Sequence, residues 1–162
     1  MGGRTVTLVG FMGSGKSTVG RVLALRLHWL FKDSDALVEE LAGKPIRRIF
    51  EEDGEAAFRE VERRVILSTP EEGNRVLAVG GGGFTEETIP FLDRLGPTVH
   101  LDLSFEEVRR RIGRDPRRPL AASPDLFGLF IRRRRLYGRA RFRVWTEGLS
   151  VDEVVDAILR LI

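Results

Sequence analysis

The sequence predicts an α/β fold in which helices cover both faces of a parallel, five-stranded sheet. Short apolar runs typical of buried strands alternate with longer stretches of helical periodicity along the chain. A glycine-rich motif joins the first predicted strand to the first predicted helix. The 162 residues are 42% hydrophobic and 31% charged, which suits one globular domain over residues 1–162.

Strands are predicted where apolar residues stand together, and helices where they recur at helical spacing. Gly54 divides two helices, and Pro45 begins one because proline suits a first helical turn. Thr85 is expected to cap a helix, and Ser104 and Ser150 open two more as capping boxes. In order we expect a strand at about 5–9, a helix at 16–27, a strand at 29–31, helices at 36–41, 46–52 and 55–67, a strand at 75–79, a helix at 85–95, a strand at 99–103, helices at 105–112 and 124–138, a strand at 142–145 and a helix at 151–162.

Residues 10–17, Gly-Phe-Met-Gly-Ser-Gly-Lys-Ser, match the Walker A pattern of phosphate-binding loops. The glycines let the backbone point its N–H groups inward, and the following helix N-terminus attracts a polyanionic phosphate. We expect Lys16 to reach the β- and γ-phosphates of a bound nucleotide and Ser17 to bind Mg²⁺. The expected nucleotide-binding residues of the loop are Gly13, Ser14, Gly15, Lys16, Ser17 and Thr18.

Two other polar segments follow predicted strands directly: the pair Asp33 and Asp35, and the glycine run at residues 80–83. Ligands bind beyond the carboxyl ends of strands in parallel sheets, so both segments should meet the phosphate loop. Two carboxylates two residues apart point the same way on extended backbone. Asp33 is a candidate Mg²⁺ ligand, and Asp35 a candidate acceptor for the proton of an attacking hydroxyl. Helix capping by Asp33 or Ser34 is the alternative.

Arg59 and Glu62 are three residues apart on a predicted helix, so Glu62 can orient Arg59 toward a substrate carboxylate. An exposed ion pair is the alternative. The glycine run at 80–83 suits a place where a ligand touches the backbone, and a flexible turn is its alternative.

Residues 113–124 are rich in arginine and proline without periodicity, which predicts an exposed, mobile lid. A cationic lid that closes over ATP excludes water and neutralises charge, although a solvated charge run is the alternative. The arginines that enter or occupy this loop are Arg111, Arg114, Arg117 and Arg118. Of the four arginines at 132–135, at most two can face a site, because helical neighbours diverge by about 100°. His28 and His100 have no partners at metal-ligand spacing and are expected to be structural.

The composition argues against several other classes of protein. The chain has no cysteine, which excludes disulfides and thiol chemistry. No apolar run approaches the ~18 residues of a membrane span. The net charge is +3, but acidic residues are interspersed and no aromatic stripe accompanies the basic ones, so we expect no nucleic-acid partner. We expect a cytoplasmic location, because nucleotide triphosphates are in the cytosol. We also expect a monomer without membrane contact.

Taken in order and spacing, the motifs resemble the shikimate kinase family over nearly the whole chain. The segments that carry the resemblance are the phosphate loop at 10–18, Asp33-x-Asp35, Gly43-x-Pro45-Ile46, Ile49-Phe50, Gly54-Glu55, Phe58-Arg59-x-x-Glu62, Gly80-Gly81-Gly82, Arg118-Pro119-Leu120 and Leu136-Tyr137. The resemblance implies an adenylate-kinase-like P-loop kinase fold with a substrate-binding subregion at about 34–62 and a lid at about 113–124. It also implies transfer of the γ-phosphate of ATP, with Mg²⁺, to the 3-hydroxyl of shikimate, a step toward chorismate and the aromatic amino acids.

The resemblance also assigns roles to single residues. Shikimate would be held by Asp35, Arg59, Gly80, Gly81, Gly82 and Arg133, with the two arginines on its carboxylate. The catalytic set would be Lys16, Asp35 and Arg118, and Arg111 would lie near the adenine. Arg133 is chosen among its neighbours because it stands three residues before Leu136, as in the family's Arg-x-x-Leu-Tyr. The chain departs from the family pattern at Gly83, where Ala is usual, at Ala121, where Leu is common, and at Arg135, where Pro is common.

Two other functions stay open on the residues alone. A gluconate or nucleotide kinase would use the same scaffold, and gluconate also offers a carboxylate to Arg59. The glycine triplet and the Phe-Arg-x-x-Glu motif favour shikimate. A nucleotide-dependent binding module would keep the phosphate loop but would not need an anion pocket or an arginine-rich lid.

Overall fold

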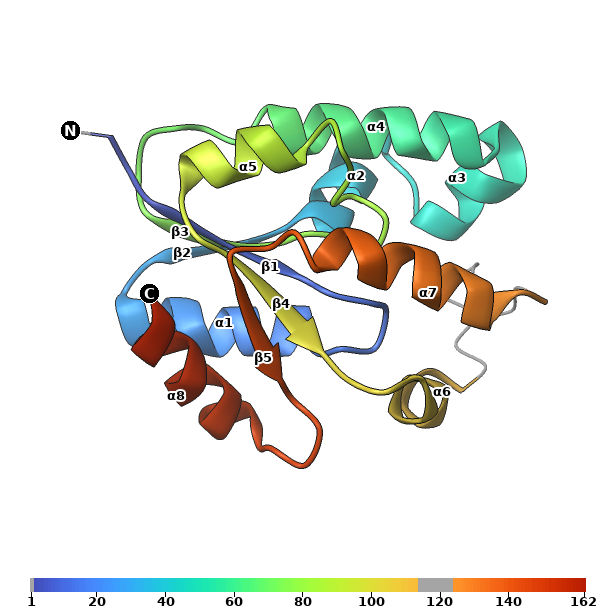
Figure 1. Ribbon diagram of the computed structural model, residues 1–162. Helices are drawn as coiled ribbons and strands as arrows, with labels where there is room; N and C mark the ends of the chain where they lie inside the picture. Colours follow the sequence, from blue (N-terminus) through green and yellow to red (C-terminus); the bar gives the residue numbers. More distant parts are fainter. Residues whose placement is uncertain (1, 114–123) are drawn as a thin grey trace.

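The computed structural model describes residues 2–113 and 124–162 and confirms the predicted α/β architecture (Figure 1). The described strands are β1 (Thr5–Val9), β2 (Leu30–Asp33), β3 (Arg75–Ala78), β4 (Thr98–Asp102) and β5 (Phe142–Trp145). They pair in parallel in the order β2-β3-β1-β4-β5. The chain fills the β2–β3 side of β1 first and then crosses to β4 and β5. The winding therefore reverses at β1, whose carboxyl end opens a crevice for ligands.

Helices cover both faces of this sheet, as buried parallel strands require (Figure 1). The described helices are α1 (Lys16–Leu27), α2 (Ser34–Ala42), α3 (Ile46–Asp53), α4 (Glu55–Leu67), α5 (Ile89–Leu95), α6 (Phe105–Ile112), α7 (Leu126–Tyr137) and α8 (Val151–Leu161). In Figure 1, α1 and α8 lie below the sheet, and α4, α5 and α7 lie above it. Within the described ranges, no helix combines the length and hydropathy that a membrane span needs.

The described residues form three apolar cores. One joins the sheet to α1 and α8 around Leu8, Leu23 and Ile158. A second fills the opposite face and includes Leu92 of α5 and Phe130 of α7. A third, smaller core of Val38, Ile49, Phe58 and Val65 lies among α2, α3 and α4. The part of the chain between β2 and β3 therefore has a core of its own.

The start of α5 differs from the sequence prediction. The helix begins at Ile89, not at residue 85. Pro90 has no N–H to donate to the carbonyl of Glu86, so a helix could not run through it from residue 85. Thr85 and Thr88 form a turn before the helix, in which each hydroxyl accepts the backbone N–H of the other residue, at 2.9 and 3.2 Å.

The two predicted capping boxes have different outcomes. Ser150 and Glu153 form the full reciprocal pair at the start of α8. At the start of α6, Ser104 accepts the N–H of Glu107 at 3.2 Å, but its own N–H donates to Glu147 at 3.1 Å. The carboxylate of Glu107 instead pairs with Arg110 and Arg111. The α6 box is therefore completed by a residue 43 positions away, because Glu107 has two arginines within reach on its own helix.

Candidate active site

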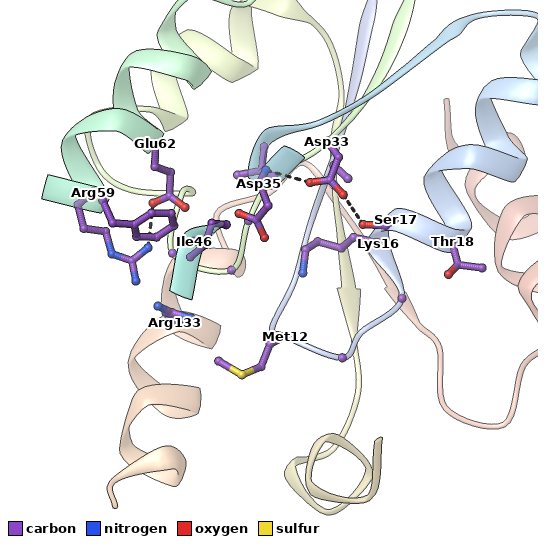
Figure 2. Close-up of a pocket in the computed structure, with 18 of the residues that line it drawn as sticks. Met12, Lys16, Ser17, Thr18, Asp33, Asp35, Ile46, Arg59, Glu62 and Arg133 are labelled. Atoms are coloured by element: carbon purple, nitrogen blue, oxygen red, sulfur yellow. Dashed lines mark hydrogen bonds and ion pairs between the residues drawn. The ribbon is translucent and has the colours of Figure 1, made fainter. Parts of the chain in front are cut away.

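A cavity of about 220 Å³ lies at the carboxyl edge of the sheet, where the phosphate loop, the end of β2, α3, α4, the glycine run and α7 meet. Its walls include Lys16, Ser17, Asp33, Asp35, Arg59, Glu62, Gly80, Gly81, Gly82 and Arg133. Figure 2 shows Asp35 between the Arg59–Glu62 pair on one side and Lys16 on the other. The structure thus brings side chains from both ends of the chain to one cavity.

The phosphate loop has the backbone conformation that its glycines allow. Gly13 and Gly15 have φ angles of 81° and 92°, a left-handed region that other residues rarely adopt. Among the described residues, no side chain caps the N-terminus of α1 at Gly15. The Lys16 ammonium donates to the carbonyls of Gly10 and Phe11 at 2.6 and 3.1 Å, which holds the amine across the loop. Backbone N–H groups, a helix N-terminus and an ammonium make this loop an anion site.

Asp33 caps a helix, as the alternative in the sequence analysis allowed, and it also contacts Ser17 of the phosphate loop. Its Oδ1 accepts the N–H of Asp35 at 2.9 Å and so caps α2, while its Oδ2 accepts the hydroxyl of Ser17 at 2.5 Å. Because of this cap, α2 begins at Ser34, not at residue 36. The expectation that Asp33 and Asp35 share extended backbone is therefore wrong, since Asp35 lies in the first helical turn. Both carboxylates nevertheless line the cavity.

Asp35 is a half-buried carboxylate between charges of both signs. Burial raises the pKa of Asp35 above its usual value, and the negative charge of Asp33 adds to the rise, while the charges of Lys16 and Arg59 oppose it. A Cβ on Gly80 would overlap Asp35 Oδ1, so the glycine is what lets the carboxylate lie against the backbone. A carboxylate with a raised pKa is a better proton acceptor than a carboxylate with the usual pKa.

Arg59 is held by acidic residues of its own helix. Its Nη1 donates to Glu62 at 2.9 Å, and its Nη2 lies 3.4 Å from Glu55. The side chain of Glu62 is only 3% exposed, and burial raises the pKa of Glu62 while the nearby Arg59 lowers it. The alternative of a merely exposed ion pair is therefore wrong for Glu62, which is buried at the cavity wall.

The four arginines at 132–135 divide as their helical spacing requires. Arg133 lines the cavity, and its guanidinium lies 5.9 Å above the ring of Phe11. Burial lowers the pKa of Arg133. Arg132 pairs with Asp125 at 3.2 Å on the surface, Arg134 pairs with the buried Asp102 at 3.0 Å, and Arg135 is exposed. One of the four therefore reaches the cavity.

The glycine run lies against the two cavity arginines. A Cβ on Gly82 would stand 2.7 Å from Arg59 Cζ and 2.9 Å from Arg133 Nη2. A Cβ on Gly81 would stand 3.0 Å from Arg133 Nη1. A side chain at either glycine would therefore displace the guanidinium groups, which converge on the same stretch of backbone.

Sequence reasoning gave no separate role to the apolar wall of the cavity. Ile46 and Phe50 of α3, Phe58 of α4 and Met12 of the phosphate loop also line it. A signal was present, because Ile46, Ile49 and Phe50 form a wide apolar stripe on a helix of only eight residues. Ile49 alone of these is fully buried in the small core, which leaves the other two to face the cavity.

The expected lid residues are only partly described. Arg111 lies beside the phosphate loop, where its Nη1 donates to the carbonyl of Gly13 at 3.3 Å while its Nε pairs with Glu107 at 2.9 Å. Arg114, Arg117 and Arg118 lie outside the described residues, as does most of the predicted lid.

The donor set beside the loop suits Mg²⁺ held together with phosphate oxygens. Residues 2–113 and 124–162 contain no group of three or more His, Cys, Asp or Glu residues that could hold a metal on their own. Ser17 and Asp33 instead offer one hydroxyl and one carboxylate at the mouth of the phosphate loop. Mg²⁺ commonly uses one or two protein oxygens and completes its shell with water and substrate phosphates.

Both histidines have structural positions. His28 is the exposed C-cap of α1, with a φ of 58°. His100 of β4 is 3% exposed, and its Nε2 lies 3.7 Å from Asp102. Burial lowers the pKa of His100 to about 4, and the carboxylate of Asp102 only partly opposes this shift.

The stability of the protein is therefore expected to fall as the pH drops from about 6.5 to about 4. In that window the unfolded chain binds a proton at His100 and the folded chain does not, which removes up to about 3 kcal/mol at the acidic end. Urea unfolding across this range should show the wild type losing more stability than His100→Phe. His28→Asn, which tolerates the left-handed backbone, should keep the wild-type dependence. Equal pH slopes for the wild type and His100→Phe would contradict the assignment.

Comparison with known proteins identifies the family to which the chain belongs. The family model described as shikimate kinase matches residues 12–162. A shikimate kinase of Synechococcus sp. (strain RCC307) is 42% identical over 98% of this chain and 84% of its own length. The crystal structure of shikimate kinase from Aquifex aeolicus superposes with a TM-score of 0.86 at 39% identity, covering 96% of this chain and 94% of that one. Shikimate kinase from Acinetobacter baumannii in complex with shikimate superposes with a TM-score of 0.89 at 36% identity, covering 98% and 92%. This chain therefore belongs to the shikimate kinase family.

Proposed function

We propose that the chain transfers the γ-phosphate of ATP to the 3-hydroxyl of shikimate within the cavity described above, giving shikimate 3-phosphate. As a member of its family the chain is an ATP-dependent kinase that phosphorylates shikimate on the route to chorismate. The observation that carries the residue-level proposal is the meeting of a phosphate-loop lysine, the half-buried carboxylate of Asp35 and two guanidinium groups in one cavity. The Acinetobacter baumannii relative with bound shikimate supports the choice of acceptor.

Shikimate is placed by its carboxylate. Arg59 and Arg133 converge on Gly82 and together offer two guanidinium groups to one anion. Asp35 and the backbone of the glycine run lie beside them and suit the ring hydroxyls. The apolar wall of α3 and α4 suits the hydrocarbon part of the ring. Residues 34–62 and the glycine run thus form the acceptor side of the cavity.

ATP is placed by the phosphate loop. The N–H groups of residues 13–18 surround the phosphates, with Lys16 beside the γ-phosphate and Arg111 toward the adenine. Arg118 lies outside the described residues, and as part of the expected lid it would bind the phosphates. Mg²⁺ would be held by Ser17 and Asp33, and when bound it would neutralise phosphate charge.

In the reaction, the 3-hydroxyl oxygen of shikimate attacks the γ-phosphorus, and the bond from that phosphorus to the β–γ bridging oxygen breaks. ADP leaves with the electrons of that bond, and the proton of the attacking hydroxyl passes to Asp35. The raised pKa of Asp35 suits it to accept this proton, although positioning the hydroxyl is the larger task in phosphoryl transfer. Lys16 stabilises the charge that develops on the transferring group.

Coupled ADP release with three acceptors tests the assignment. Shikimate should support turnover, while gluconate and nucleoside monophosphates should not rise above the rate with ATP alone. Faster turnover with gluconate or a nucleoside monophosphate would overturn the choice of acceptor, and no acceptor-dependent ADP release would favour a binding module. We also propose that the protein acts as a monomer in the cytoplasm, where ATP is available. Light scattering at working concentration tests the monomer.

Two neighbouring glycines provide a matched test of the acceptor side. Gly82→Ala would push a Cβ into both guanidinium groups, whereas Gly83→Ala would meet the ends of Ile66 and Val79 at 2.6 and 2.8 Å in the apolar core. Neither glycine has a φ in the left-handed region, so backbone strain does not distinguish the two variants. Gly82→Ala is expected to raise the KM for shikimate about tenfold, equivalent to ~1.4 kcal/mol, with little change in the KM for ATP. Gly83→Ala should change thermal stability and leave both KM values near the wild type. A larger rise for Gly83→Ala than for Gly82→Ala would contradict this placement.

A further inference from the structure

The tyrosine at the end of α7 is tied to the glycine run. Tyr137 is 1% exposed, and its hydroxyl donates to the carbonyl of Gly81. Its ring lies 5.1 Å from that of His100, in the core above the sheet. Because the Tyr137 hydroxyl is buried, breaking this bond leaves the hydroxyl unpaired, so the bond fixes two segments to each other. The two segments here are α7 and the backbone that lines the acceptor side of the cavity.

Arg133 and Tyr137 are one helical turn apart, so they lie on the same face of α7. Both approach the same glycine: a Cβ on Gly81 would stand 3.0 Å from Arg133 Nη1 and 3.6 Å from the Tyr137 hydroxyl oxygen. The tyrosine bond is therefore made at the place where the arginine enters the cavity. It sets how closely that turn of α7 approaches the glycine run.

A second polar anchor of α7 lies nearer the surface. Arg134 pairs with Asp102 through two nitrogens, at 3.0 and 3.1 Å, but its side chain is 42% exposed. Asp102 also accepts Arg143 at 2.7 Å, so it keeps a partner if Arg134 is lost. This ion pair holds the helix to the end of β4. Of the two anchors, the tyrosine hydroxyl is the one that contacts the cavity wall.

We propose that Tyr137 is a positioning residue for the substrate carboxylate, acting through Arg133. The proposal rests on the proposed function, in which Arg133 binds that carboxylate. A bidentate contact between guanidinium and carboxylate depends on angle as well as distance, so a small shift of α7 weakens it. ATP binds at the opposite side of the cavity and is not expected to sense the shift.

The test compares two isosteric variants that each remove one buried hydroxyl from the same glycine run. Tyr137→Phe removes the bond to Gly81, and Thr88→Val removes the bond that Thr88 donates to the carbonyl of Gly83 at 2.6 Å. Thr88 is also 1% exposed, but it precedes α5 and not the turn that carries Arg133. Tyr137→Phe should raise the KM for shikimate about tenfold with kcat and the KM for ATP within about twofold of the wild type. Thr88→Val should lower thermal stability without that change. Unchanged shikimate KM in Tyr137→Phe, or an equal rise in Thr88→Val, would overturn the proposal.

A double variant separates this proposal from the proposed function. If Tyr137 acts through Arg133, Tyr137→Phe should have little further effect on shikimate KM in an Arg133→Ala background. Additive effects of the two substitutions on the shikimate KM would contradict the positioning role and leave the kinase assignment intact. If Arg133→Ala itself left shikimate KM unchanged, the placement of the carboxylate would be wrong instead.

A spectroscopic measurement on the wild-type sequence tests the proposal even if Tyr137→Phe does not fold. The chain has a single tyrosine, so growth with 3-fluorotyrosine gives one ¹⁹F resonance, that of Tyr137. Saturating shikimate should shift this resonance, and ADP alone should shift it less. A resonance that responds to ADP but not to shikimate would overturn the proposal.

Discussion

Arg59→Ala is expected to weaken shikimate binding by about 2–5 kcal/mol, or roughly 30-fold or more in Kd. The loss has two sources. One guanidinium no longer meets the substrate carboxylate, and Glu62, which is buried at the cavity wall, loses the cation that stands 2.9 Å from it. The pKa of Glu62, already raised by burial, should rise further in this variant. Titration calorimetry with shikimate, and steady-state KM values for both substrates, measure the effect.

The same helix offers the control. Arg64 lies 3.7 Å from Glu60 and is 67% exposed, so Arg64→Ala removes an arginine of α4 without touching the cavity. Its shikimate affinity should match the wild type. Arg59→Lys keeps the charge but not the planar fork and should fall between the two. If Arg59→Ala raised the KM for ATP and left that for shikimate unchanged, the carboxylate would have to bind elsewhere.

Lys16→Ala is expected to lower kcat by about 10²- to 10³-fold, because the ammonium stabilises charge on the transferring phosphoryl group. Lys16 also donates to the carbonyls of Gly10 and Phe11, so its loss could act through the shape of the loop. Lys16→Gln separates the two effects, since an amide can still donate to these carbonyls but carries no charge. It should be nearly as inactive as Lys16→Ala while binding ADP more tightly than that variant.

Lys32→Ala is the matched control for this experiment. Lys32 is an exposed lysine of β2, one of the three lysines in the chain. The kcat of Lys32→Ala should stay within about twofold of the wild-type value. A Lys16→Ala enzyme that kept more than about a tenth of the wild-type kcat would remove Lys16 from the catalytic set.

Most of the fold could be predicted from the sequence because its signals are local. The apolar runs of β1 and β5 and the helical periodicities of α1 and α4 predicted the observed bounds of these elements. The Walker A motif placed the phosphate loop between β1 and α1. The bounds of β2, β4 and α7 differ from the prediction by one or two residues, and at α2 and α5 a single contact or residue explains the difference. Asp33 capping Asp35 starts α2 two residues early, and the missing N–H of Pro90 starts α5 late.

The candidate site was less accessible to sequence reasoning. Helical spacing limited how many arginines at 132–135 could face the cavity, but only the family pattern selected Arg133. The steric role of Gly82 depends on two guanidinium groups that arrive from α4 and α7. The hydroxyl contact of Tyr137 joins residues 56 positions apart. Such contacts follow from the tertiary packing and leave no periodic trace in the chain.

The small core shared by α2, α3 and α4 has a consequence for how this enzyme can change. Its members do not belong to either core that packs on the sheet. Mutations among Val38, Ile49 and Phe58 can therefore reshape the acceptor side without loosening the framework beneath the nucleotide. Recognition of the phosphate acceptor and recognition of the phosphate donor are, in this molecule, properties that selection can adjust separately.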